Sequence, residues 1–339
     1  MTDDVAVTAV APGRVNLIGD HTDTTHGLVL PMAIDLATTV AGTRGGDWVV
    51  LTSDHEPEPA VVPLDVGDPF EVEPPWARYV AGVVAELRPS HGLRGSVSTT
   101  LPVGAGLSSS AALELAVALA LGFEGTPLDL ARLCQRAEQQ ASRVPCGIMD
   151  QLASAAGVTG RALLIDCHAL TVTPTPLPAD VEVRVVHSGQ ARQLAGSAYA
   201  ERRAAAEAAE AVVGPLRLLV GAAGLAAVAR LEDPVLRRRA RHVVTENARV
   251  RAFAAALATG DVTVAGAAMA ASHASLRDDF EVSTPVLDAL VARLAAIPGV
   301  HGVRLTGAGF GGCVVALTDP GVLHEGWLVS PTRGAHLLD

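Results

Sequence analysis

The sequence predicts a protein of two domains that mixes α-helices and β-strands, and three observations support this prediction. The chain has 339 residues, which is more than one hydrophobic core usually serves. Segments with strand-like and helix-like patterns follow one another along the whole chain. Pro174, Pro176 and Pro178 lie between two strand-like segments and predict a boundary that divides the chain into 1–178 and 179–339.

The predicted first domain contains both kinds of element. Apolar or alternating runs predict strands, and apolar residues repeated every three or four positions predict helices. We expect strands at 5–11, 28–40, 48–53, 95–101 and 162–166, a polar loop at 13–27, and helices at 76–87, 108–121, 128–140 and 146–156. The stretch 54–75 is rich in Pro, Asp and Glu, which predicts a loop with one strand at most.

The predicted second domain has longer helices. We expect strands at 181–187, 300–305 and 314–317, and helices at 195–213, 234–258 and 285–296. The Ala-rich stretch 204–229 is expected to be helical because its charges recur at helical spacing.

Composition argues against several classes of function. Hydrophobic residues make up 49% of the chain, charged residues 18% and aromatic residues 3%, which predicts a large aliphatic core. The net charge of −11 and the lack of a Lys/Arg run argue against nucleic-acid binding. The four cysteines form no C-x-x-C pair, so zinc has little support and a reducing cytoplasm is expected. The acidic start and the interrupted apolar stretches predict neither a signal peptide nor a membrane span.

The stretch 101–113 has the pattern of a phosphate-binding loop. Gly104 and Gly106 let the backbone turn tightly and present its amides, and three serines at 108–110 then open a helix. Helix N-termini attract anions, so phosphate is the expected ligand. No G-K-[ST] follows, so this is not a Walker loop, and an ordinary Ser-capped helix fits the stretch equally well.

Two other stretches place carboxylates where chemistry is possible. Arg14, Asp20, His21 and Asp23 fall in one short polar segment, which suits a sugar that needs several hydrogen-bonding partners, although charged loops are common. Asp150 lies near the start of a largely apolar helix. It fits either a first-turn residue that satisfies the helix dipole or a carboxylate that accepts a hydroxyl proton in a partly dry cleft.

The glycine-rich stretch 306–313 superficially resembles a dinucleotide fingerprint. That fingerprint requires a helix after the glycines, whereas here an apolar strand follows at 314–317. A turn that lies against a ligand or another loop is the better interpretation.

Together and in this order, these stretches resemble galactokinases of the GHMP kinase superfamily. Residues 13–34 are similar to the galactokinase signature, 101–114 to the superfamily phosphate loop, and 137–138 with 145–151 to the segment with the catalytic Asp. Further similar segments lie at 199–203, 241–247, 272–280 and 305–313. The resemblance implies a two-domain α+β GHMP kinase fold, with a ribosomal S5 domain 2-like first domain and a ferredoxin-like second domain. ATP and sugar would meet in the cleft between them.

The resemblance also implies ATP-dependent phosphorylation of D-galactose at the C1 hydroxyl. Asp150 would take or orient the hydroxyl proton beside Arg14, and Ser110 and Glu138 would hold Mg²⁺. The sugar would be held by Asp20, His21, Asp23, Gly147 and Tyr199. The ATP phosphates would be held by Gly104, Ala105, Gly106, Leu107, Ser108, Ser109, Ser110 and Ala111. We expect the enzyme to be a monomer.

The sequence departs from the family pattern near the expected sugar pocket. Asp20 stands where the family usually has Glu, and Thr24 and Thr25 stand where it has Tyr-Asn. These changes leave open a related substrate, such as a galactosamine derivative or arabinose. A sugar and ATP sensor without catalysis is a further alternative, but the phosphate loop and the Arg14–Asp150 combination are intact. Arg143 replaces a common Gly and points either toward the triphosphate or into solvent.

Overall fold

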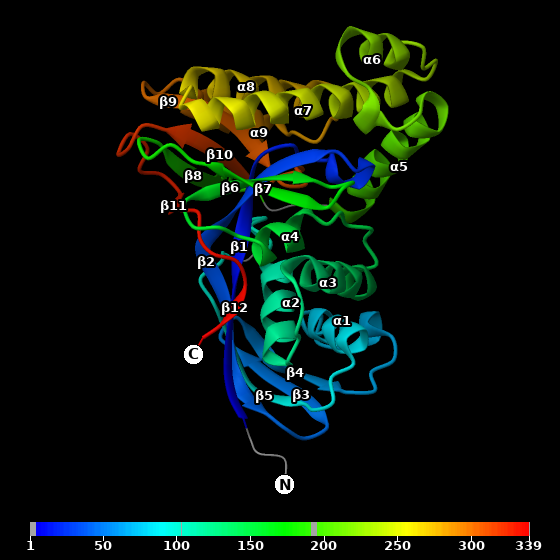
Figure 1. Ribbon diagram of the computed structural model, residues 1–339, viewed down its shortest axis with the longest axis vertical. Coiled ribbons are helices and arrows are strands. Elements are labelled where there is room, and N and C mark those ends of the chain that lie inside the picture. The colour runs from blue at the N-terminus through cyan, green and yellow to red at the C-terminus, as the bar shows by residue number, and fades with distance from the viewer. Residues whose placement is uncertain (1–4, 103, 191–194, 339) are drawn as a thin grey trace.

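The protein is described by a computed structural model that covers residues 5–102, 104–190 and 195–338. Two β-sheets lie one above the other along the long axis, and the strands β1 and β2 run through much of the molecule's height (Figure 1). Helices α1 to α4 lie beside the lower sheet, and α7 and α8 cover the upper end. The expected mixture of helices and strands is confirmed.

The first sheet is built mainly from the N-terminal half of the chain. Its central path runs in the order β12-β1-β2-β5-β3-β4, and β6 and β7 continue it from β2. All described pairings in it are antiparallel except β3 with β5. The strands are β1 (Val5–Ile18), β2 (Leu28–Arg44), β3 (Trp48–Ser53), β4 (Glu56–Pro63), β5 (Leu93–Thr99), β6 (Arg161–Asp166), β7 (Thr171–Pro176) and β12 (His336–Leu337).

Helices α1 (Ala77–Leu87), α2 (Ser109–Ala120), α3 (Pro127–Ser142) and α4 (Met149–Ala155) accompany this sheet. Helix α3 begins at a capping box in which the side chains of Thr126 and Asp129 satisfy each other's backbone amides, with Pro127 at the first helical position. Short 3₁₀ turns occur at η1 (Asp23–Thr25) and η2 (Pro69–Glu71). Helix α4 starts three residues later than the predicted 146, so Cys146 and Gly147 lie in the loop before it.

The second sheet is antiparallel, in the order β11-β8-β10-β9. Its strands are β8 (Glu182–His187), β9 (Val300–Thr306), β10 (Cys313–Thr318) and β11 (Trp327–Val329). The helices of this half are α5 (Ala195–Val213), α6 (Gly221–Val228), α7 (Pro234–Thr259), α8 (Val262–Asp278) and α9 (Pro285–Ala295), with a 3₁₀ turn at η3 (Leu216–Leu218).

Several elements differ from the sequence-based expectation: β11 and β12 were not predicted, and the Ala-rich stretch 204–229 is divided among α5, η3 and α6. Strand β1 continues to Ile18, so Arg14 lies on a strand and not in the predicted loop. Strand β7 contains Pro174 and Pro176, which the sequence analysis placed between elements; it pairs only with β6, and an edge strand tolerates prolines. Helix α8 was not predicted, because its buried side is made largely of Ala, Gly and Ser.

The chain changes sheets between β7 and β8, which is the region of the proline cluster. The last strand, β12, returns to the first sheet and pairs with β1 through Ala9 and Leu337. The predicted second domain, 179–339, therefore ends in a strand that belongs to the first sheet.

The core is aliphatic, as the composition predicts. Among the described residues, Phe253 and Phe280 are the only buried aromatic side chains in a set dominated by Ala, Val and Leu. Within the described part of the chain, no helix is long and apolar enough to cross a membrane.

Small residues allow α8 to lie close against β9. A Cβ added to Gly266 would be 1.9 Å from the carbonyl oxygen of His301, so an alanine does not fit unless the helix moves.

We expect Gly266→Ala to lower the free energy of unfolding by about 1–3 kcal/mol, despite the better helix propensity of Ala. Denaturant unfolding measures the change. Gly67→Ala, where an added Cβ meets nothing within 4 Å, is the control and should be nearly neutral. Equal stability of the two variants would contradict this packing.

Candidate active site

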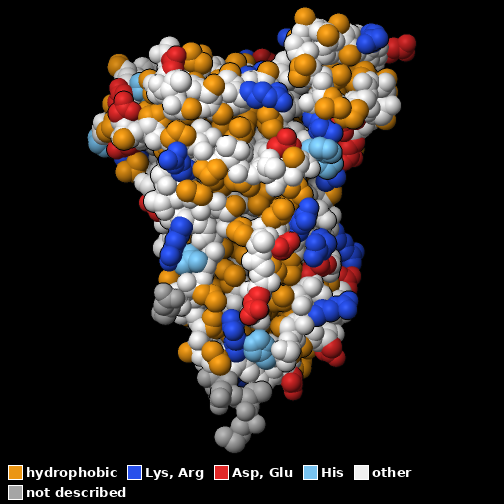
Figure 2. Space-filling model, viewed as in Figure 1, with side chains coloured by type: hydrophobic (Ala, Val, Ile, Leu, Met, Phe, Trp, Pro, Cys, Tyr) orange, Lys and Arg blue, Asp and Glu red, His pale blue; other side chains and the backbone are white. Residues whose placement is uncertain are grey.

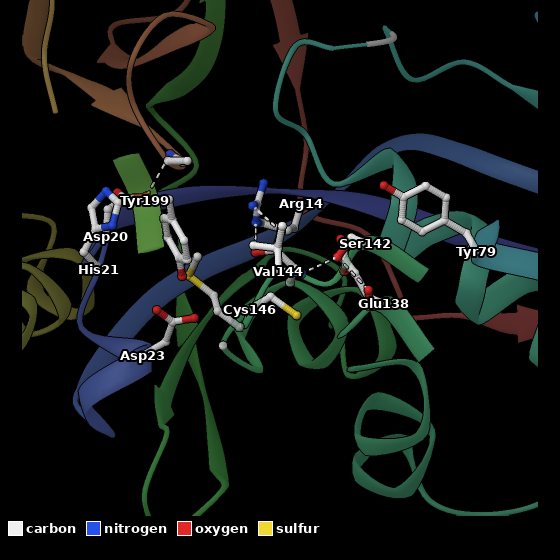
Figure 3. Close-up of a pocket in the computed structure, with 15 residues that line it drawn as sticks. Arg14, Asp20, His21, Asp23, Tyr79, Glu138, Ser142, Val144, Cys146 and Tyr199 are labelled. Atoms are coloured by element: carbon white, nitrogen blue, oxygen red, sulfur yellow. Dashed lines mark hydrogen bonds and ion pairs between the residues drawn. The ribbon is translucent and has the colours of Figure 1, made fainter. Parts of the chain in front are cut away.

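A cavity of about 370 Å³ lies where the two halves of the chain meet. Its lining residues come from β1, the following loop, α1, α3, the loop before α4, α4, α5 and the turn after β9 (Figure 3). The structure brings eight of the predicted site residues to this cavity: Arg14, Asp20, His21, Asp23, Glu138, Gly147, Asp150 and Tyr199.

An ion pair between Arg14 and Asp150 occupies the centre of the site. Arg14 Nε lies 2.8 Å from Oδ1 of Asp150, and Nη2 lies 2.6 Å from Oδ2, so the contact is bidentate. The third guanidinium nitrogen, Nη1, donates to the carbonyl of Gly106 at 2.7 Å. The Arg14 side chain is only 6% exposed, whereas that of Asp150 is 31% exposed and reaches the cavity. This arrangement fixes a carboxylate in place with a cation beside it.

Ser108 is a third partner of this pair. Its hydroxyl donates to Oδ2 of Asp150 at 2.5 Å. Ser108 stands at the N-cap of α2, as expected for a Ser-capped helix, but its side chain makes no capping hydrogen bond. The residue has φ 60° and turns its hydroxyl toward Asp150 instead.

The predicted phosphate loop forms the turn that leads into α2. Gly104 and Gly106 have φ of 74° and 79°, which is the left-handed region that favours glycine. The loop contacts the base of the site, since the amide of Arg14 donates to the carbonyl of Leu107. Gly106, Leu107 and Ser108 of this loop contact Arg14 or Asp150. None of the eight predicted phosphate residues lines the cavity itself: Gly104, Ala105, Gly106, Leu107, Ser108, Ser109, Ser110 and Ala111.

Glu138 and Ser110 form a second oxygen cluster next to the central pair. The Ser110 hydroxyl donates to Oε1 of Glu138 at 2.9 Å. Burial, together with the charge of Asp150, raises the pKa of Glu138 to about 7. The Glu138 carboxylate is disfavoured as an anion unless a positive charge lies beside it. A carboxylate of this kind and the Ser110 hydroxyl are suitable oxygen ligands for Mg²⁺, which usually binds through one or two carboxylates plus substrate phosphates. The described residues include no cluster of three or more His, Cys, Asp and Glu side chains able to hold a metal alone.

The opposite side of the cavity carries the predicted sugar residues. Figure 3 shows Asp20, His21, Asp23 and Tyr199 on one side of Arg14, with Glu138 on the other. Burial raises the pKa of Asp23 to about 6, with Asp150 and Asp20 adding to the effect. Several acceptors therefore face a partly dry pocket.

Gly147 lies against Asp23. A Cβ on Gly147 would be 1.8 Å from the Asp23 carboxylate oxygen, so any other residue would displace that side chain. Its role in the structure is thus to leave space for Asp23.

His21 is held in place by its neighbours. Its ring centroid lies 4.6 Å from that of Phe280 and 5.6 Å from that of Tyr199. Burial and the nearby His242 and Arg304 lower the pKa of His21 to about 3, so the ring is neutral. Its buried Nε2 has no hydrogen-bond partner among the described residues. A neutral imidazole with a free nitrogen is available to a hydroxyl group.

Asp20 is more constrained than the sequence suggested. One oxygen pairs with the fully buried Arg304 of β9, and the other accepts the amide of Gly307 at 2.8 Å. Arg304 was not among the predicted site residues, although a single Arg between apolar residues of a predicted strand is a signal for a buried ion pair. The glycine-rich turn after β9 lies against the Asp20 loop, which agrees with its interpretation as a turn packed on another loop.

Helix α7 supports the same loop from the second half of the chain. His242 Nε2 lies 3.1 Å from the carbonyl oxygen of Asp20, and Glu246 accepts the amide of Gly19 at 3.0 Å. Asn247 accepts the amide of Leu28 at 2.7 Å. The cavity therefore depends on both halves of the molecule.

Of the two orientations considered from sequence, Arg143 takes the one on the surface: its side chain is largely exposed and does not line the cavity. Its guanidinium pairs with Asp68 at 2.8 Å and lies 4.1 Å from the centroid of the Phe70 ring. It fastens η2 to the end of α3.

Comparisons with known proteins agree with this geometry. Residues 2–44 match the galactokinase galactose-binding signature, and 78–158 and 253–324 match the N-terminal and C-terminal GHMP kinase domains. A galactokinase from Roseiflexus sp. (strain RS-1) is 45% identical, over 91% of this chain and 82% of the relative. The chain belongs to the galactokinase family. The resemblance stated from the sequence is confirmed, and so are the GHMP kinase fold and the assignment as a kinase.

Solved structures support the same assignment. Lactococcus lactis galactokinase complexed with galactose is 30% identical and matches with a TM-score of 0.88, covering 98% of this chain and 95% of that one. Mevalonate kinase of L. major, in complex with R-mevalonate, is 17% identical with a TM-score of 0.66, covering 96% of each chain. The second match shows the shared fold alone.

The raised pKa of Glu138 predicts that this residue lowers the free energy of unfolding of the nucleotide-free protein, by an amount that depends on pH. The pKa of Glu138 is about 7 in the folded state and ordinarily 4.5. The folded protein therefore loses stability as pH rises from 4.5 to 7, and the loss is complete above pH 7. We expect Glu138→Gln to be more stable than wild type by about 2 kcal/mol at pH 8 and by little at pH 4.5. Thermal unfolding without metal across this range measures the difference.

Glu58→Gln, at an exposed position of β4, is the control for the substitution itself. A stability difference between Glu138→Gln and wild type that does not grow with pH would contradict the assigned environment of Glu138.

Proposed function

We propose that this galactokinase family member transfers the γ-phosphoryl group of ATP to the C1 hydroxyl of D-galactose, giving α-D-galactose 1-phosphate and ADP. The observation that carries the proposal is the bidentate Arg14–Asp150 pair at the cavity. It lies between a cluster of sugar-compatible acceptors and the Ser110–Glu138 oxygens. The membership of the chain in the family supports the choice of reaction and sugar.

Asp150 is the residue that we expect to meet the C1 hydroxyl. The hydroxyl proton passes to, or is oriented by, the Asp150 carboxylate while the sugar oxygen bonds to the γ-phosphorus. The bond between that phosphorus and the bridging oxygen breaks, and its electrons leave on ADP. Arg14 stays beside the reacting oxygen and stabilises the negative charge that develops there.

Ser108 keeps Asp150 aimed at this point. Its hydrogen bond and the two from Arg14 together fix the carboxylate in the plane of the guanidinium. Positioning of this kind lowers the entropic part of the barrier, which is the main contribution that a protein makes to phosphoryl transfer.

ATP and Mg²⁺ are assigned to the other side of Arg14. Ser110 and Glu138 would hold Mg²⁺, and the amides from Gly104 to Ala111 would bind the phosphates at the start of α2. Bound Mg²⁺ would neutralise charge on the triphosphate. It would also favour the ionised form of Glu138, which burial alone disfavours.

The sugar is assigned to the acceptors on the opposite side. Asp23 and the neutral His21 offer hydrogen-bonding atoms toward the cavity, and Gly147 leaves the space that Asp23 needs. The ring and hydroxyl of Tyr199 border the same space. Asp20 has remaining lone pairs but is already held by Arg304 and Gly307.

The state of Asp20 favours one second candidate. Because this short carboxylate is drawn toward Arg304, the pocket next to it suits a related sugar, such as a galactosamine derivative or arabinose. The choice of substrate then depends on whether another hydrogen bond replaces the one that Asp20, held by Arg304, does not make to the sugar.

A coupled ADP-release assay with purified protein, ATP and Mg²⁺ tests the activity. We expect galactose to give the highest kcat/KM in a panel that includes galactosamine, N-acetylgalactosamine, arabinose and glucose. Asp150→Asn, which keeps the size of the side chain, should reduce turnover at least 10³-fold because it removes the proton acceptor. No turnover with any sugar would defeat the proposal, and a different leading sugar would support the second candidate.

Arg14 should act mainly on turnover. We expect Arg14→Ala to lower kcat by about 10²–10³-fold and to change the KM for galactose only a few-fold, because Arg14 faces the charge that develops during transfer. Steady-state kinetics separate the two constants. Proportionate losses in kcat and in sugar affinity would contradict this role.

A further inference from the structure

Two fully buried polar side chains lie next to Glu138. They are Glu114 of α2 and Gln151 of α4, and each is 0% exposed. Neither lines the cavity. Glu114 follows Ser110 by one helical turn, so both project from the same side of α2.

Gln151 connects the two carboxyl groups. Its side-chain nitrogen donates to Oε2 of Glu138 and lies 3.5 Å from Oε2 of Glu114. An amide nitrogen carries two hydrogens, so it is able to serve both acceptors. Since Ser110 donates to the other oxygen of Glu138, the two oxygens of this carboxylate are held from opposite sides by α2 and α4.

Stability alone does not explain Glu114. Burial and the nearby Glu138 raise its pKa well above the ordinary value, so the surroundings disfavour the charged form. Within the described part of the chain, Glu114 Oε1, Gln151 Oε1 and Ser154 Oγ are all buried without a hydrogen-bond partner. Buried polar groups with incomplete pairing cost stability, and an apolar side chain of similar size is usually no worse.

We propose that Glu114 and Gln151 are positioning residues for the metal carboxylate: Gln151 fixes the orientation of Glu138, and Glu114 fixes that of Gln151. This inference rests on the proposed role of Glu138 and Ser110 in holding Mg²⁺. Partners behind a metal ligand set its orientation, and their loss typically reduces metal affinity 10–100-fold. The inference therefore extends the metal site into the core, to residues that touch neither substrate.

The test measures metal binding directly. Mn²⁺ is titrated into the full-length protein with a non-hydrolysable ATP analogue, and free Mn²⁺ is followed by electron paramagnetic resonance. The variants are Glu114→Met and Gln151→Met, which keep side-chain length but remove the hydrogen bonds. Glu114→Gln keeps a polar partner for Gln151, and Ser154→Ala is a matched control in the same buried region.

We expect the dissociation constant of Mn²⁺ to rise at least tenfold in Gln151→Met and about fivefold or more in Glu114→Met. Glu114→Gln and Ser154→Ala should remain within about twofold of wild type. The melting temperature without metal should be unchanged or higher in Glu114→Met, because an incompletely paired buried acid is removed. The KM for galactose should not change.

Wild-type Mn²⁺ affinity in both methionine variants would overturn the inference, whether or not their melting temperatures fall. If Glu114→Met does not fold, the Mn²⁺ affinity of Gln151→Met alone tests the inference, since this variant removes the direct donor to Glu138. Glu138→Gln separates the two proposals. If it binds Mn²⁺ like wild type, the proposed metal site fails; if it loses Mn²⁺ while the methionine variants do not, only the positioning role fails.

Discussion

The bidentate contact between Arg14 and Asp150 is the interaction on which the site depends. It joins two residues 136 positions apart, one on β1 and one on α4. Because Arg14 also bonds to the carbonyl of Gly106, one guanidinium fixes the Asp150 carboxylate and the loop before α2 relative to each other. A flexible carboxylate or a displaced loop would each lose the geometry that phosphoryl transfer requires.

Around this pair the protein gathers more negative than positive groups. Asp20, Asp23 and Glu138 lie at the same cavity as Asp150 and Arg14. Burial and mutual repulsion raise the pKa values of Asp23 and Glu138 into the range of about 6 to 7. Such a site lowers the stability of the unliganded protein, and a ligand that donates hydrogen bonds or a bound cation would offset this loss.

Close backbone approach explains several features that side-chain chemistry does not. Gly147 leaves space for the Asp23 carboxylate, and Gly266 lets α8 pack against β9. The loop that carries Asp20 is held by Arg304 of β9 and by His242 of α7. The two halves are thus joined through the loop that carries Asp20, and the position of Asp20 depends on residues more than 200 positions away.

The sequence by itself determined the aliphatic core, most strands and helices, and the family, because these depend on composition, local periodicity and contiguous motifs. It also predicted Arg14, Asp150 and Glu138 as site residues, because they lie inside such motifs, and the structure places all three at the cavity. Only the tertiary structure decided that the hydroxyl of Ser108, at the N-cap of α2, bonds to Asp150, and that Asp20 is held by Arg304. It also showed the return of β12 to the first sheet and the burial of Glu114 beside Gln151. The physical reason is that hydrogen bonds and ion pairs between distant segments depend on how the elements pack, and local pattern carries no record of that packing.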